Sequence, residues 1–87
     1  MALLLNQNQP NPFDGQTLIP FTLGQQTNVQ LEVFDLVGNR VMTLVNGPQM
    51  AGNHNVSFDS GSLSAGMYMY VLTTGQGRQT KRMVVSK

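Results

Sequence analysis

Apolar and polar residues alternate along most of this chain, and this alternation limits the fold more than any other feature of the sequence. Val29, Leu31 and Val33 are separated by Gln30 and Glu32, and the same period of two recurs in several later segments. Successive side chains of a β-strand point to opposite faces, so each such segment is expected to be a half-buried strand. No stretch carries a sustained helical period. The chain is therefore predicted to be all-β.

Six or seven short strands follow from this pattern, with glycine or asparagine at nearly every corner between them. So many short strands in one small chain predict an immunoglobulin-like antiparallel β-sandwich of about seven strands. The chain has no cysteine, so the disulfide of antibody domains is absent. We expect a single domain over residues 1–87, with residues 1–4 as a linker or an artificial start. The expected strand segments are 18–23, 29–34, 40–45, 53–58, 67–74 and 78–86.

Particular residues refine this prediction. Pro20 cannot donate a backbone hydrogen bond, so its strand should lie at a sheet edge or carry a bulge there. Gly38 and Asn39 both tolerate positive φ and predict a two-residue hairpin loop. Apolar residues on both faces of 67–74 predict a central strand.

The remaining connections are expected to be irregular. Asn46, Gly47 and Pro48 predict a loop, and the segment 59–66 should be rich in turns, with one helical turn around Leu63. Side chains that the strands turn inward should form a single core. The expected core residues are Ile19, Phe21, Leu31, Val33, Val41, Val56, Phe58, Val71 and Met83.

Composition argues against several functional classes. The net charge is +1 with 10% charged residues, whereas nucleic-acid binding needs clustered cations that neutralise phosphates. One histidine, four carboxylates and no cysteine leave little for acid–base or nucleophilic chemistry. No apolar run approaches the roughly 18–20 residues that span a bilayer. We therefore expect no enzyme, no cofactor, no nucleic-acid partner and no membrane insertion.

Polar residues that could form a site have simpler interpretations. His54 has no second histidine or cysteine with which to hold a metal, so we interpret it as a structural residue. Oxygen ligands for calcium could come from Asp14, Asp35, Asn46 and Asp59, but these residues lack the close spacing of calcium loops. Their expected role is in turns and caps, and we expect no metal site.

Aromatic residues could support a second function. Phe34, Tyr68 and Tyr70 could form a platform on which a sugar ring stacks, which would make the chain a carbohydrate-binding or adhesive module. Tyrosines on a central strand more often pack at the edge of the core with their hydroxyls hydrogen-bonded. Exposure of these rings would distinguish the two interpretations.

Four segments, taken in order, resemble a known family. LNQNQPNPF at 5–13 is similar to an L-x-Q-N-x-P-N-P-F opening, and 28–41 to a V-x-L-x-V-y-D-x-x-G-r-x-V hairpin, although here Asn39 stands between the glycine and the basic residue. The segment 63–72 matches L-x-x-G-x-Y-x-y-x-L, and 81–87 matches a basic ending with an apolar centre. Together they resemble the type A C-terminal sorting domains of the type IX secretion system of Bacteroidota.

This resemblance implies a sorting signal at the end of a secreted cargo protein, which precedes it in the chain. The domain would pass through the periplasm, be recognised by the outer-membrane translocon and be removed by a sortase-like peptidase, leaving the cargo at the cell surface or in the medium. The positions that match the family's G-x-Y segment and basic end are the expected recognition residues. These are Gly66, Tyr68, Lys81, Arg82 and Lys87.

A physical mechanism for recognition is strand addition at the last strand. An edge strand presents unpaired backbone groups to a partner, and Lys and Arg side chains can fix the register. We hypothesise that Lys81 and Lys87 contribute to recognition and little to folding. The same edges could pair two copies of the chain weakly. A structural spacer, resembling the immunoglobulin-like domain of flagellar hook-capping proteins, is the remaining alternative.

Overall fold

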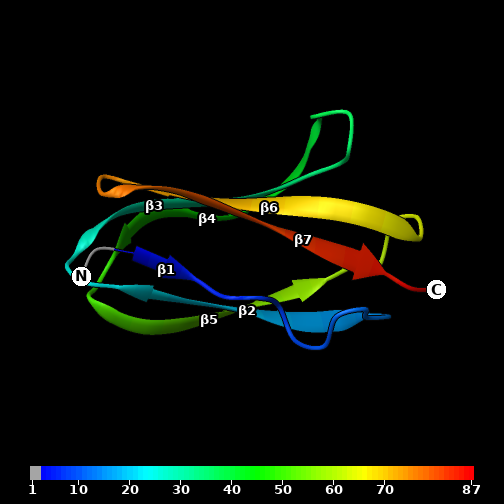
Figure 1. The fold of residues 1–87 in the computed structure, drawn as a ribbon, viewed down its shortest axis with the longest axis horizontal. Helices are drawn as coiled ribbons and strands as arrows, with labels where there is room; N and C mark the ends of the chain where they lie inside the picture. The colour runs from blue at the N-terminus through cyan, green and yellow to red at the C-terminus, as the bar shows by residue number, and fades with distance from the viewer. Residues whose placement is uncertain (1–2) are drawn as a thin grey trace.

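A computed structural model describes residues 3–87, which form two antiparallel sheets packed face to face (Figure 1). The predicted immunoglobulin-like β-sandwich is confirmed. The three-stranded sheet has the order β1-β2-β5, and its strands are β1 (Leu3–Leu5), β2 (Gln16–Leu23) and β5 (Gly52–Asp59). The four-stranded sheet has the order β4-β3-β6-β7, and its strands are β3 (Thr27–Phe34), β4 (Arg40–Gln49), β6 (Gly66–Thr74) and β7 (Gly77–Val85).

The core fills the space between the sheets, as alternation predicts. Six of the expected core residues are almost completely buried: Ile19, Phe21, Leu31, Val33, Phe58 and Met83. Val56 is partly buried against this core. The prediction omitted Phe13, whose ring packs edge-on against Phe58 with 6.1 Å between centroids. It also omitted Tyr70 and Leu72, which β6 turns inward; Val71 is buried too, but it lies outside the main core cluster.

Val41 is not a core residue, contrary to the prediction. Its exposed fraction is 37%. The pairing of β3 with β4 shifts between Val33 and Phe34, whose partners are Met42 and Arg40, so Val41 is an extra residue at a β-bulge. In Figure 1 this end of the hairpin rises away from the sandwich, beyond the reach of the facing sheet.

The hairpin loop is also longer than expected. β3 and β4 are joined by five residues, Asp35 to Asn39, instead of by Gly38 and Asn39 alone. Asp35 N donates to Asn39 O at 3.0 Å, and only Gly38 takes positive φ, at 91°. A glycine followed by a bulged pairing is a recognised longer hairpin, so the hairpin is confirmed while its predicted loop length is wrong.

Pro20 lies in β2, the middle strand of its sheet, and the strand has no bulge there. The prediction of an edge strand or a bulge at this proline is therefore wrong. The pairing of β2 with β5 runs without a shift from Gln16 to Leu23. β1 ends at Leu5, and Asn6 N donates to Pro20 O at 3.0 Å just beyond it. The proline therefore sits where the neighbouring strand has already stopped, which removes the need for its N–H.

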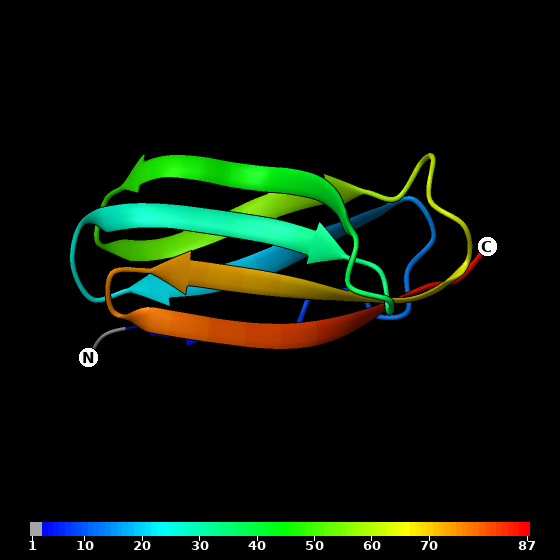
Figure 2. The same cartoon turned by 90° about the horizontal axis from the view of Figure 1, so that it is seen from above.

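Three further segments differ from expectation. Residues 46–48 continue β4 instead of forming a loop, and Pro48 is tolerated because β4 is an edge strand (Figure 2). The connection after β5 is a turn in which Leu63 N donates to Ser60 O at 2.7 Å, without the expected helical turn. Residues 3 and 4 belong to β1, and residues 1–2 of the expected linker lie outside the described part. Over residues 3–87, no helix is long and apolar enough to cross a membrane.

Candidate functional site

The N-terminal segment, residues 6–15 between β1 and β2, is hydrogen-bonded to both sheets and closes one side of the sandwich. Gln9 pairs with Leu18 of β2 through two backbone hydrogen bonds of 2.9 Å. Further on, Phe13 N donates to Val84 O at 3.0 Å, and Phe13 O accepts from Ser86 N at 2.8 Å. The segment is thus hydrogen-bonded to the middle of one sheet and to the end of β7 in the other.

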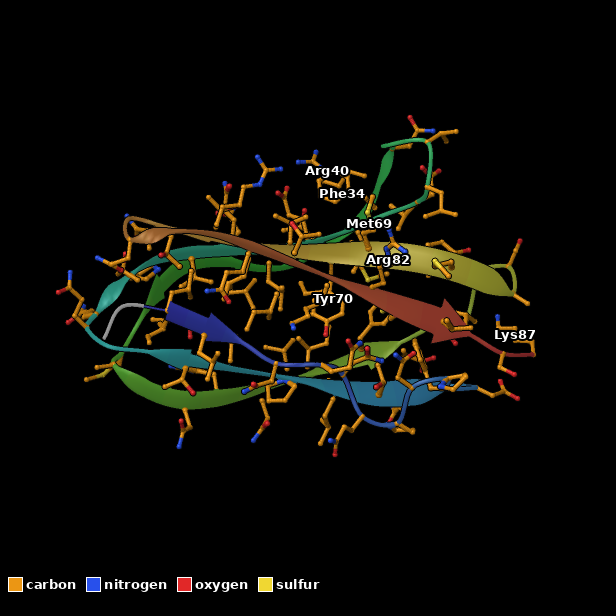
Figure 3. The ribbon with its side chains drawn as sticks, viewed as in Figure 1. Phe34, Arg40, Met69, Tyr70, Arg82 and Lys87 are labelled. Carbon is orange, nitrogen blue, oxygen red and sulfur yellow. The ribbon has the colours of Figure 1, made fainter. Side chains whose placement is uncertain are left out.

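The Tyr70 hydroxyl holds this segment from the inside. It accepts a hydrogen bond from Asn8 N at 2.8 Å and donates one to Asn6 O, also at 2.8 Å. Tyr70 is fully buried on β6, and Figure 3 shows its side chain between the two sheets. One phenol therefore satisfies a buried N–H and a carbonyl of a segment that has no strand partner at this point.

The Asn8 side chain completes the same contact. Its exposed fraction is 1%, and its amide nitrogen donates to Pro10 O and Thr17 Oγ1, both at 3.1 Å. Its amide oxygen accepts from Gln7 Nε2 at 2.7 Å. Every hydrogen bond made by this buried amide stays within the N-terminal segment or joins it to β2, so Asn8 fixes the shape of the segment.

A second side-chain amide closes the gap between β1 and β7. Leu5 N donates to Gln79 Oε1 at 2.7 Å, and Gln79 Nε2 donates to Leu3 O at 3.0 Å. The amide thereby takes the place that a peptide group of a neighbouring strand would occupy. No sequence pattern singled out Asn8 or Gln79 for these roles.

Burial of Tyr70 predicts a stability change in alkali. Desolvation by burial raises the pKa of Tyr70 from 10.0 to about 12, and the hydrogen bond from Asn8 N lowers it only in part. Between these two pKa values the unfolded chain ionises first, so the folded state loses relative stability as the pH rises. We expect the free energy of unfolding to fall by about 2 kcal/mol between pH 10 and 12, a slope that urea titrations should show and that Tyr70→Phe should remove. An equal slope in Tyr70→Phe would contradict this assignment.

The C-terminal end of β7 is attached to the loop between β5 and β6. Lys87 Nζ donates to three carbonyl oxygens, at 3.2 Å to Ser60, 3.0 Å to Gly61 and 2.5 Å to Leu63. Tyr68 is only 8% exposed, and its hydroxyl donates to Ser64 O at 2.8 Å. Both side chains therefore bind the backbone of this one loop.

Gly66 stands where the loop enters β6 and is required by its backbone. Its φ is +149°, in the region that residues with a Cβ rarely adopt, while a Cβ there would meet no atom within 4 Å. The glycine is thus explained by conformation and not by a close neighbour. Together with Tyr68 and Lys87, it shapes the loop at the C-terminal end of the sandwich.

Lys87 is expected to contribute measurably to folding, contrary to the hypothesis that it contributes little, because its ammonium group is hydrogen-bonded within the domain. Replacing it with Met removes three hydrogen bonds to backbone carbonyls while keeping most of the side chain. We expect Lys87→Met to lower the free energy of unfolding by about 1 kcal/mol, because charge-assisted bonds at an exposed site are partly replaced by water. Lys81→Met is the control, since Lys81 donates no hydrogen bond to residues 3–87. Equal denaturation midpoints for the two variants would show that the Lys87 contacts contribute nothing.

Lys81 and Arg82 occupy different positions from Lys87. Lys81 is partly buried and pairs with Tyr70 across β6 and β7, so strand alternation places it on the inner side of its sheet. Arg82 is exposed on the opposite side, next to Met69 (Figure 3). The five expected recognition residues therefore form no single cluster.

β7 is an edge strand, as expected, but much of its outer edge is occupied. Arg82 O accepts from Gln7 Nε2 at 2.5 Å, and Val84 N donates to Asn11 Oδ1 at 2.9 Å. Val84 O and Ser86 N are hydrogen-bonded to the backbone of Phe13. A partner strand could not add along this half of β7 without displacing the N-terminal segment. β4 and β5 are the edge strands on the other side of the two described sheets.

Three of the other candidate residues, His54, Asp35 and Asp59, use their side chains in contacts within the domain. The His54 ring stacks on Phe21 with 4.9 Å between centroids, and its Nε2 lies 2.7 Å from Met50 O. Asp35 accepts from Val37 N and Asn39 N inside the hairpin loop, which is the turn role predicted for it. No group of three metal-ligating side chains occurs in residues 3–87.

The alternative interpretation of the aromatic residues, a sugar platform, is wrong. Tyr68 and Tyr70 are both buried and use their hydroxyls on the backbone, so neither ring presents a face to a ligand. Phe34 is half-buried on the other side of the same sheet. These positions remove the observation on which a carbohydrate-binding function rested.

Comparison with known proteins identifies the family. No curated protein matches the chain. A family model described as the secretion system C-terminal sorting domain matches residues 9–86. That match contains most of the N-terminal segment and all but the last residue of the attached C-terminal end. The chain therefore belongs to the family of C-terminal sorting domains of the type IX secretion system.

Proposed function

We propose that the outer-membrane translocon of the type IX system recognises this domain in its folded state, after transit through the periplasm. The family makes the domain a sorting signal of type IX secretion, which implies an attached cargo and export to the cell surface or the medium. In this proposal a sortase-like peptidase then separates the domain from the cargo. The family match over residues 9–86 is the observation that supports it most.

The proposed recognition residues take two kinds of role. Gly66, Tyr68 and Lys87 set the shape of the loop and chain end that a partner meets. Gly66 supplies a positive φ, and the side chains of Tyr68 and Lys87 donate hydrogen bonds to carbonyl oxygens of the loop. Lys81 and Arg82 are the proposed contact residues, since both are cationic residues of the edge strand β7 and neither has a salt-bridge partner within residues 3–87. A partner would then contact the C-terminal end of the sandwich and, separately, two cationic side chains on opposite sides of β7.

Secretion of a fluorescent cargo fused before this domain tests the proposal in a Bacteroidota host. We expect Lys81→Glu to reduce export severalfold while leaving the thermal midpoint of the domain within a few degrees of the original. Lys87→Met is the comparison variant: it lowers the stability of the domain slightly but leaves the Lys81 side chain in place, so it shows how much export depends on stability alone. The mass of the exported cargo reports whether a peptidase removed the domain. Unchanged export of Lys81→Glu would remove that residue from recognition, and uncleaved exported cargo would exclude the peptidase step.

A further inference from the structure

The outer faces of the two sheets differ in chemistry. The outer face of the three-stranded sheet has no lysine or arginine among the described residues; uncharged polar side chains such as Gln16, Asn53 and Asn55 lie there beside Leu4 and Leu18. On the four-stranded sheet, three arginines lie beside apolar side chains, and we call this surface the arginine face. Its residues are Phe34, Arg40, Met69, Val71, Arg78 and Arg82. In Figure 3, Phe34, Arg40, Met69 and Arg82 lie together on the side opposite Tyr70.

A groove with an apolar floor crosses the arginine face. It has a volume of about 320 Å³ and is lined by Phe34, Gly38, Met69, Val71, Arg78 and Thr80. Methionine is common at binding surfaces because its flexible thioether adapts to partners of different shape. The groove therefore offers apolar contact area with a cation at its rim.

The β3–β4 hairpin forms a rigid wall at this groove. Leu36 and Val37 are 61% and 83% exposed at its tip, and the hairpin stands above the sheet in Figure 1. Its loop is fixed from within, because the Asp35 carboxylate accepts from Val37 N at 3.1 Å and from Asn39 N at 2.9 Å. Two apolar side chains are thus held in water by a preorganised loop, which lowers the entropy cost of binding a partner.

The charge of the arginine face favours an acidic occupant. Arg40 is paired with Glu32 at 3.0 Å, whereas neither Arg78 nor Arg82 has a salt-bridge partner within residues 3–87. Three arginines against Glu32 give the face two excess positive charges, and the Asp35 carboxylate in the hairpin wall offsets one of them. Arginine presents several donors in a planar fork that matches a carboxylate.

We propose that the arginine face binds a segment of a partner protein in which carboxylates alternate with apolar side chains. The apolar side chains lie in the groove against Phe34 and Met69, and the carboxylates pair with Arg78 and Arg82. A lipid surface fits less well, since headgroup binding uses clusters of four or more cations and the arginine face has three arginines, one of them paired with Glu32. This inference rests on the proposed function, because it names the chemistry of the partner that meets the folded domain.

A matched pair of double variants tests the arginine face. Arg78→Gln with Arg82→Gln removes two positive charges, and the control, Gln25→Glu with Asn55→Glu, changes net charge equally at exposed positions elsewhere. The binding probe is a synthetic peptide that alternates Glu with Leu and Phe, and its counterpart carries Lys in place of each Glu. Binding is followed by amide chemical shifts of the labelled domain and by cargo export in the Bacteroidota host.

We expect the acidic peptide to shift the amides of Gly38, Val71 and Thr80, and the arginine variant to bind it about five- to tenfold more weakly. The control variant should bind it like the original, and the lysine peptide should shift none of these amides. Export should fall severalfold in the arginine variant alone. Absence of peptide shifts at the groove, or unchanged export of the arginine variant, would overturn the inference while leaving the sorting function intact.

Two further outcomes would change the assignment of the arginine face or of the whole domain. Sedimentation with vesicles of phosphatidylcholine and phosphatidylglycerol that is lost in the arginine variant would assign the face to a lipid surface and overturn the inference. Failure of the original domain to export cargo, in a host where a known sorting domain succeeds, would refute the proposed function instead. In that case the peptide shifts still decide whether the arginine face binds an acidic segment.

Discussion

Leu31→Ala is expected to lower the free energy of unfolding by about 2–5 kcal/mol, the largest effect of any single substitution considered for this domain. Leu31 is completely buried in β3, where it pairs with Leu72 of β6 and Val45 of β4. Its replacement removes apolar burial and leaves a cavity that two sheets, each held by hydrogen bonds, cannot readily close. A domain of 87 residues has roughly 4–13 kcal/mol of stability in total, so the variant should lie near the limit of folding.

Urea titration followed by circular dichroism measures this loss. Leu18→Ala is the control, because Leu18 is 49% exposed on the adjoining sheet and its removal leaves no internal cavity. The control should change stability by less than about 1 kcal/mol. A loss below about 1 kcal/mol in Leu31→Ala, or equal losses in both variants, would mean that Leu31 does not occupy the core.

Asn8→Ala is expected to cost about 2–4 kcal/mol, an unusual amount for an asparagine outside the strands. The substitution removes the three hydrogen bonds of a side chain that is 1% exposed, and Pro10 O keeps only its bond from Thr17 Oγ1, at 2.8 Å. Buried hydrogen bonds contribute about 1 kcal/mol each, and the lost side-chain volume adds to this. In Asn8→Ala, the amide protons of the N-terminal segment should also exchange faster than they do in the original domain, while those of the strands change less.

Hydrogen exchange and denaturation together check this prediction. Asn55→Ala is a suitable comparison, since Asn55 is exposed on β5 and should tolerate the change. The amide of Phe13, which is bonded to Val84 O, is the reporter for the segment. Unchanged protection of Phe13 together with unchanged stability in Asn8→Ala would contradict the role assigned to Asn8.

Alternation predicts the strands well because each buried segment shows its inner face directly in the sequence. Leu31 and Val33 on one strand and Phe58 on another are predicted correctly for this reason. The pattern is ambiguous at β6, where both faces are apolar, and the prediction therefore selects Val71 in place of Tyr70. A prediction from alternation also assumes that the strands pair without irregularities. The bulge at Val41 interrupts the pairing of β3 with β4, so alternation does not give the correct face for this residue.

The N-terminal segment could not be derived from alternation, because its contacts are made by side-chain amides and a phenol across a long sequence separation. Asn8 and Tyr70 meet although 62 residues separate them. The resemblance to the sorting family identified this segment as a motif, and the structure gives the physical reason for several of its residues. The arginine face was likewise beyond prediction, since it depends on which strands share an outer surface.

Export of a foreign, folded cargo tests the central claim most directly. The fluorescent cargo, fused before this domain, is expressed in a type IX-competent host and in the same host without its translocon. We expect most cargo outside the competent cells or on their surface, and nearly all of it retained inside the translocon-deficient cells. Retention in both strains, while a known sorting domain exports the same cargo, would contradict the account, as would equal export from both.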